Sequence, residues 1–136
     1  MNPVFWLRLA SVLSLLFTAG HTLGGRKSWS PMGETEVLQA MRNVRFTVMG
    51  NSRTYLDFYL GFGFMLAVFL LAQAILLWQL GALASSNPGA ARPLIGVFVL
   101  VSLGSTLLSW RFLFPVPAIF AGVITVCLAI AFFAAA

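Results

Sequence analysis

The chain has 136 residues, of which 60% are hydrophobic and only 8% are charged, and its net charge at pH 7 is +5. About a quarter of the residues of a soluble domain are charged, so this composition excludes an ordinary soluble domain and predicts a single domain in a bilayer. Only 8 Lys or Arg and 3 Asp or Glu side chains produce this net charge, and so few charges make nucleic acid an unexpected partner. A small positive excess instead suits contact with anionic lipid head groups.

Four apolar runs are each long enough to cross a hydrocarbon core as a helix, which takes about 20 residues. Helices are expected because every backbone polar group must be satisfied inside lipid. The predicted fold class is all-α, an integral membrane four-helix bundle that forms one domain over residues 1–136. The predicted spans are 4–23, 55–80, 94–110 and 115–135.

The segment between the first two spans has an amphipathic pattern. Ser30-Pro31 is a typical helix start, and apolar residues then recur at three- and four-residue spacing until Gly50. The pattern predicts a helix over about residues 31–49 that lies in the membrane interface, either as a lid packed on the bundle or as a ligand gate. Asn51-Ser52 are expected to cap the second span.

The remaining connections are predicted to be short. Residues 81–93 should form a loop that carries Arg92, and Pro115 should begin the last span. Because spans alternate in direction, the end of span one, the start of span two, the end of span three and the start of span four share one membrane side. The positive-inside rule places this side, with the charge-rich segment 25–54, in the cytoplasm.

Two stripes of hydroxyl side chains are expected to face the bundle interior and to form a polar seam between spans one and three. The stripes are Ser11, Ser14, Thr18 and Thr22 in span one, and Ser102, Ser105, Thr106 and Ser109 in span three. Gly20-x-x-x-Gly24 predicts close packing of the backbone beside His21. Gln73, near mid-membrane, is expected to join helices.

Ionisable residues in a membrane chain point to function, and here they gather on one side. His21 and Asp57 are the candidate catalytic acid–base pair. The candidate ligand-binding residues are Arg42, Arg45, Arg53, Tyr55, Tyr59, Trp110 and Arg111. The arginines would hold an anionic or polar head group, while Phe62 and Phe64, next to two glycines, would contact an apolar tail.

A purely structural interpretation competes with this site. Arg53 and Asp57, spaced i, i+4, would form an ion pair, the tyrosines and Trp110 would be interfacial anchors, and His21 would satisfy a backbone carbonyl. No metal or other cofactor is predicted, because a metal site needs two or three suitable ligands. Cys127 is the only cysteine and is expected to be a small buried apolar residue.

The strings Gly20-His21-Thr22-Leu23-Gly24, Met41-Arg42-Asn43-Val44-Arg45-Phe46, Met49-Gly50 and Tyr55 to Gly63 (YLDFYLGFG) resemble a family of small bacterial four-span proteins of unknown function. The resemblance covers nearly the whole chain. It implies a protein of the bacterial inner membrane whose polar motifs gather on one side, and it implies no particular reaction or substrate.

The sequence therefore predicts a membrane-embedded binding protein for a lipid-like or amphiphilic molecule. It leaves open whether the site also carries out acid–base chemistry. The first alternative is a small transporter or channel, which would need a homo-oligomer because four short spans enclose little volume. The second alternative is an accessory or assembly subunit of a membrane complex.

Overall fold

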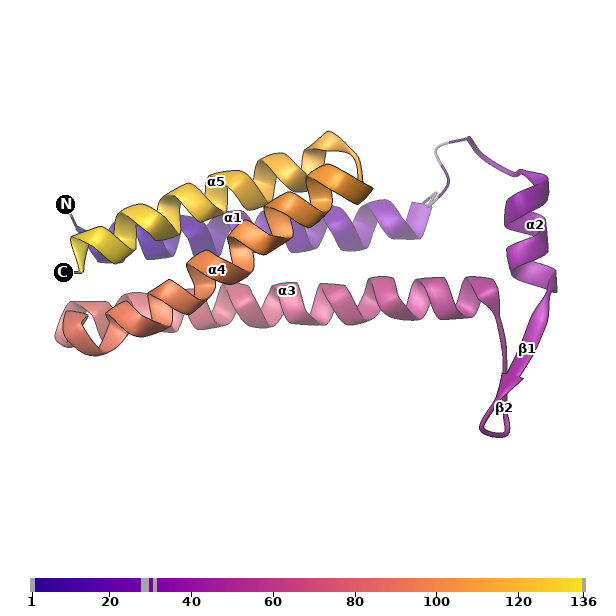
Figure 1. Cartoon of the computed structure of the whole chain (residues 1–136), viewed down its shortest axis with the longest axis horizontal. Helices are drawn as coiled ribbons and strands as arrows, with labels where there is room; N and C mark the ends of the chain where they lie inside the picture. The colour runs from indigo at the N-terminus through magenta and orange to yellow at the C-terminus, as the bar shows by residue number, and fades with distance from the viewer. Residues whose placement is uncertain (1, 28–29, 31, 136) are drawn as a thin grey trace. The chain divides into compact units, whose positions relative to one another are not determined.

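The computed structural model describes residues 2–27, 30 and 32–135, which form five helices and one β-hairpin (Figure 1). The elements are α1 (Pro3–Lys27), α2 (Glu36–Asn43), β1 (Arg45–Val48), β2 (Asn51–Thr54), α3 (Tyr55–Ser86), α4 (Pro88–Phe112) and α5 (Pro115–Ala134). Four helices, α1, α3, α4 and α5, are long and apolar enough to cross a membrane. The predicted helical class with four candidate spans is confirmed.

The chain divides into two compact units. The bundle unit comprises Met1–Thr18 and Leu70–Ala136, and the hairpin unit comprises Ala19–Phe69. Both α1 and α3 continue from one unit into the other, so each helix contributes one part to each unit.

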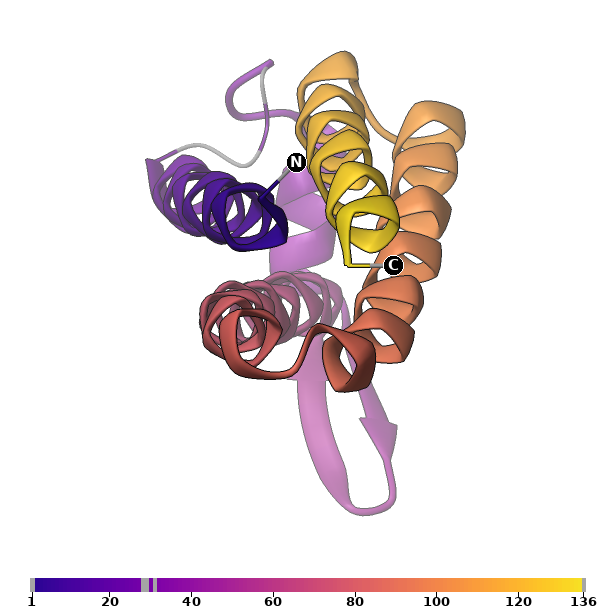
Figure 2. The ribbon, with the colours of Figure 1, turned by 90° about the vertical axis from the view of Figure 1, so that its left-hand side faces the viewer.

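All four long helices contribute to the core of the bundle unit. Leu7, Leu77, Ile95 and Leu128 are fully buried there, one from each helix. Within this unit α4 and α5 run side by side in opposite directions (Figures 1 and 2). Many large apolar side chains point outward instead, for example Leu100, which is 70% exposed. Such exposure is typical of helices that face lipid.

The connection between α3 and α4 is a single residue, so the predicted loop over 81–93 is wrong. Residues 82–86 are mostly Ala and Ser and continue α3 to Ser86. Asn87 then caps α4, because its Oδ1 accepts a hydrogen bond from the Ala90 backbone N–H at 3.1 Å. Pro88 occupies the first turn of α4, where a missing N–H costs nothing, and Pro93 is accommodated inside the helix.

The hydroxyl stripe of α1 packs on α3. Ser11 Oγ donates to the Ala74 carbonyl at 2.7 Å, and Gln73 Nε2 donates to Ser14 Oγ at 3.2 Å. Ser11 and Ser14 are both buried. Gln73 therefore joins two helices, as its depth predicts.

The hydroxyl stripe of α4 packs on α5 and not on α1, so the single predicted seam is in fact two. Ser102 Oγ donates to the Ala121 carbonyl at 3.1 Å, and Thr125 lies 2.8 Å from the same hydroxyl. Thr106 Oγ1 lies 3.4 Å from Thr125 Oγ1. Only two residues separate α4 from α5, so the two helices pack side by side. The hydroxyl stripe of α4 therefore bonds to α5, the next helix along the chain.

In the hairpin unit the predicted helix over 31–49 is much shorter. It begins after Thr35, whose Oγ1 accepts a hydrogen bond from Leu38 N, and it ends at Asn43. Pro31, the predicted start, lies outside the described residues. Arg45–Val48 forms an antiparallel hairpin with Asn51–Thr54, so Asn51-Ser52 belong to a strand and do not cap α3. An aromatic and two β-branched residues in a row, Phe46 to Val48, favour a strand over a helix.

Met49 and Gly50 form the two-residue turn of this hairpin. Both have positive φ values, 51° and 79°, as a turn that matches the twist of a hairpin requires. Glycine adopts this conformation freely, whereas an L side chain such as that of Met49 is destabilised there by roughly 1–2 kcal/mol. The turn is thus built with a strained methionine at its tip.

Candidate functional site

The hairpin joins α3 through a reciprocal cap. Thr54 Oγ1 accepts a hydrogen bond from Asp57 N at 3.0 Å, and Asp57 Oδ2 accepts one from Thr54 N at 2.9 Å. This is a capping box, which satisfies two backbone donors at a helix start. Thr54 is buried, while Asp57 is exposed. The carboxylate of Asp57 thus has a structural role at the first turn of α3.

Arg45 and Arg53 both contact Ser52, one on each side of the hairpin. Arg45 Nε donates to Ser52 Oγ at 3.2 Å, and Arg53 Nη1 donates to the Ser52 carbonyl at 2.8 Å. Both cations are close enough to act electrostatically on Asp57. The predicted Arg53–Asp57 ion pair is absent from the described residues, because Arg53 turns to the strand backbone and Asp57 to the cap.

The two arginines are exposed and keep further donors. A guanidinium has five N–H groups, of which each of these arginines uses one in its contact with Ser52. The remaining N–H groups form a fork that matches a carboxylate or a phosphate. The base of the hairpin is therefore a surface with two guanidinium groups and one carboxylate, that of Asp57.

A connected series of aromatic rings lies next to this surface. The ring centroid of Phe46 is 5.0 Å from that of Tyr55 and 5.8 Å from that of Phe58, which in turn lies 4.9 Å from that of Phe62. Tyr55, Phe58 and Phe62 are each about half exposed, at 50%, 55% and 55%. Their spacing along α3 places them on one helix face, so they form a continuous apolar strip that leads away from the arginines.

His21 lies near the end of α1 and is half-buried. Its Nε2 donates to the Gly63 carbonyl of α3 at 3.0 Å. This contact links the two helices within the hairpin unit, and it is the backbone contact that the structural interpretation expects. A Cβ built on Gly20 or Gly24 would meet no described atom within 4 Å. The predicted close packing at these glycines is therefore not found among the described residues of the hairpin unit.

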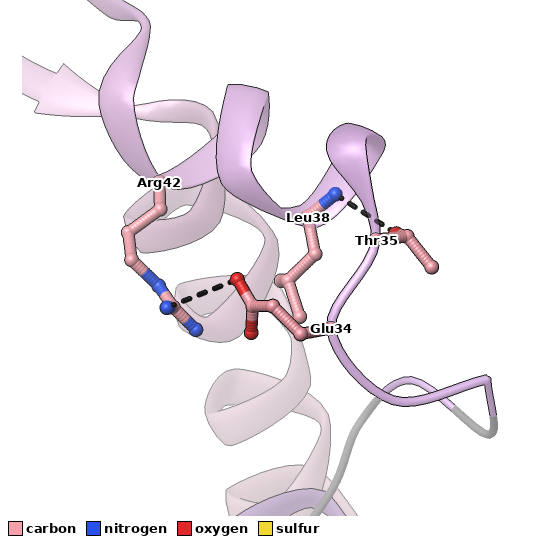
Figure 3. Close-up of polar contacts among 4 residues, drawn as sticks. All are labelled: Glu34, Thr35, Leu38 and Arg42. Atoms are coloured by element: carbon pink, nitrogen blue, oxygen red, sulfur yellow. Dashed lines mark hydrogen bonds and ion pairs between the residues drawn. The ribbon is translucent and has the colours of Figure 1, made fainter.

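Arg42, in the last turn of α2, forms an ion pair at 3.3 Å with Glu34, which precedes the N-cap of the same helix (Figure 3). Their side chains are 55% and 47% exposed, so solvent screens the pair strongly. Because Glu34 already neutralises it, Arg42 is less suited than Arg45 or Arg53 to hold an anion. Leu38 is buried on the same helix, next to the Thr35 cap (Figure 3).

Trp110 and Arg111 belong to the bundle unit. Trp110 is 77% exposed and lines a shallow depression of about 160 Å³ together with Leu113, Phe114 and Pro115. The Arg111 guanidinium lies 5.2 Å from the centre of the Phe112 ring. Their convergence with the residues of the hairpin unit stays a prediction.

Tyr59, the remaining candidate, is 49% exposed on α3. Sequence reasoning missed three parts of this region: the Thr54 cap, the strand that carries Phe46, and the Met49-Gly50 turn. Thr54-x-x-Asp57 has the spacing of a capping box, and this signal would have located the true start of α3.

The chemistry that this region offers is binding of an anion next to an apolar strip. His21 and Asp57 each hold a structural hydrogen bond, so their acid–base role stays a prediction. No group of three His, Cys or carboxylate side chains within residues 2–27, 30 and 32–135 is placed to hold a metal ion. Comparison with protein-family models, with curated proteins and with solved structures gives no match.

Proposed function

We propose that the protein is a multi-pass protein of the bacterial inner membrane that binds an amphiphilic molecule with an anionic head group at the hairpin unit. One observation carries the proposal: Arg45 and Arg53 both contact Ser52 at the base of the hairpin, and Phe46, the cross-strand partner of Arg53, begins an aromatic strip that continues through the half-exposed Tyr55, Phe58 and Phe62. The arginines suit the head group and the strip suits the tail.

The four apolar helices support a membrane location, and the sequence resemblance described above supports the bacterial inner membrane. The charge-rich segment 25–54 would then face the cytoplasm. In this arrangement the first turn of α3 lies at the membrane surface, where a head group and a tail separate.

A transport path between the helices has less support. Ser11, Ser102 and Thr125 use their hydroxyl groups to bond backbone carbonyls. Hydroxyls used in this way pack helices together and do not line an open path. Binding is therefore the function that the described contacts favour.

The experiment is a binding titration of the protein in mild detergent. The probes are short-chain phosphatidic acid, which is anionic, and short-chain phosphatidylcholine, which has the same tails but no net charge. The double variant Arg45→Gln/Arg53→Gln removes both proposed ligands of the head group. Charge-assisted hydrogen bonds contribute roughly 1.5–3 kcal/mol each, so the Kd for phosphatidic acid should rise about tenfold or more.

The matched control is Arg42→Gln, which also removes a cation from the hairpin unit but one that is paired with Glu34. Its Kd should change by less than about threefold, since exposed ion pairs are weak. Equal losses in both variants, or equal affinity of the unaltered protein for the two probes, would show general charge attraction and overturn the assignment. Mass spectrometry of molecules that stay bound through purification then identifies the natural ligand.

A further inference from the structure

The tip of the hairpin combines strain with exposure. Met49 has a φ of 51° and is 96% exposed, and its neighbour Val48 is 57% exposed. Hairpin turns of this kind favour Asn, Asp or Gly, which tolerate the left-handed conformation and are compatible with water. Met49 is unfavourable at this position in water, because its backbone is strained and because its apolar side chain is exposed. A surrounding medium other than water would remove the second of these costs.

The direction of the hairpin indicates what those surroundings are. Thr54, the last residue of β2, is followed directly by Tyr55, the first residue of α3. The hairpin leaves this point across the axis of α3 in both views (Figures 1 and 2). Because a strand rises about 3.4 Å per residue, the tip lies about 14–17 Å to the side of the start of α3. If α3 crosses a bilayer, the hairpin extends along the bilayer surface.

The charges of the hairpin fit the same location. Residues 45–54 contain two arginines and no carboxylate. The exposed Arg45 and Arg53 lie at the base, and the apolar Val48 and Met49 lie at the tip. Cations beside an apolar protrusion are the pattern of a segment that contacts lipid phosphates and enters the acyl boundary.

We infer that the Val48–Met49 tip inserts into the interfacial layer of the bilayer that α3 crosses, with an anionic phospholipid surface as its partner. The insertion removes Met49 from water and compensates for its backbone strain. This inference requires the membrane location of α3, but it does not require a bound ligand at the arginines. Insertion of the tip can be disproved while amphiphile binding at the arginines stands, and amphiphile binding can be disproved while insertion of the tip stands.

The test places a fluorescent probe at the tip. Cys127 is first replaced by Ala, so that Met49→Cys carries the only thiol for a nitrobenzoxadiazole label. The matched control is Ser86→Cys, an exposed polar position at the other end of α3. Both proteins are reconstituted in phosphatidylcholine vesicles that contain phosphatidylglycerol. One quencher is a lipid with a nitroxide near the top of its acyl chain, and the other is aqueous iodide.

The expected result is that the label at Met49 emits at shorter wavelength than the label at Ser86, is quenched by the nitroxide lipid and is protected from iodide. Quenching by iodide without quenching by the nitroxide lipid would overturn the inference. Protection from both quenchers would also overturn it, because the tip would then be covered by protein.

A second pair of proteins separates insertion from folding. Two proteins carry the label at Val48→Cys. One keeps Met49, and the other also contains Met49→Asn. Asn adopts the left-handed conformation readily, so the turn is kept while its apolar tip is lost. Nitroxide quenching at Val48 should fall at least twofold in Met49→Asn, with an unchanged circular dichroism spectrum. Unchanged quenching would show that Met49 does not hold the tip in lipid.

Discussion

Thr54 and Asp57 exchange two hydrogen bonds, of 3.0 and 2.9 Å, at the point where the hairpin ends and α3 begins. This pair of hydrogen bonds has two structural effects. It stabilises the helix start, and it fixes the direction in which the strand arrives. Because Asp57 is also a candidate catalytic residue, its structural and chemical roles must be separated by experiment.

Thr54→Ala is expected to lower the free energy of unfolding by about 0.5–2 kcal/mol, because the Asp57 N–H loses its acceptor at the helix start. Thermal unfolding followed by circular dichroism in detergent measures the change. Asp57→Asn keeps an oxygen acceptor for the Thr54 N–H and removes only the charge, so it should destabilise less. If Asp57→Asn keeps the fold and still abolishes a measured activity, the carboxylate acts in chemistry as well as in the cap.

The contact between Gln73 and Ser14 is expected to hold α1 against α3. Gln73→Leu or Ser14→Ala alone should each lower stability, and the double variant should show a coupling of about 0.6 kcal/mol, as is usual for hydrogen bonds between membrane helices. Unfolding in mixed detergent and dodecyl sulfate micelles measures all four proteins of the cycle. Ser105→Ala is the control, since the Ser105 hydroxyl bonds the Val101 carbonyl of its own helix. A coupling of zero would mean that the hydrogen bond contributes nothing to packing.

Two glycines of α4 should respond in opposite directions to alanine. A Cβ on Gly96 would lie 3.2 Å from the Phe132 ring of α5, whereas a Cβ on Gly104 would meet nothing within 4 Å. Gly96→Ala should therefore destabilise the bundle unit by forcing the ring aside. Gly104→Ala should leave stability unchanged or raise it by up to about 1 kcal/mol, because alanine is the better helix former. The same unfolding assay compares them, and a loss at Gly104 would contradict the packing described for α4.

The ion pair between Arg42 and Glu34 is expected to contribute little to stability. Glu34→Gln should change the free energy of unfolding by less than about 1 kcal/mol, because both side chains are half exposed and screened. The small effect should vanish when salt is raised. Melting temperatures at low and high ionic strength provide the measurement. A large, salt-independent loss would indicate that Glu34 has a second partner in the folded protein.

The helical class and the four candidate spans could be predicted because they depend on local composition. A run of about 20 apolar residues has few alternatives to a helix. The short element between the first two spans could not be predicted in this way. Val44 to Met49 has apolar residues at spacings that suit a helix, but Phe46, Thr47 and Val48 favour a strand, and the Gly50 turn allows that strand to pair.

The partners of polar side chains depend on which helices are neighbours, and spacing along one helix does not reveal this. The prediction pairs the stripe of α4 with α1, whereas Ser102 and Thr106 contact α5. In the same way, Arg53 and Asp57 have the spacing of an ion pair, but the nearer backbone groups of Ser52 and Thr54 compete successfully for them.

The division of the chain into two units also divides its titratable side chains. The only histidine, His21, and the three carboxylates, Glu34, Glu36 and Asp57, all belong to residues 19–69, while the charged side chains of the bundle unit are Arg8, Arg92 and Arg111. Each of these arginines lies over an aromatic ring. The charged side chains of the bundle unit are thus all guanidinium groups, which keep their proton in proteins. Acid–base chemistry that uses a histidine or a carboxylate of this protein must therefore use residues of the hairpin unit.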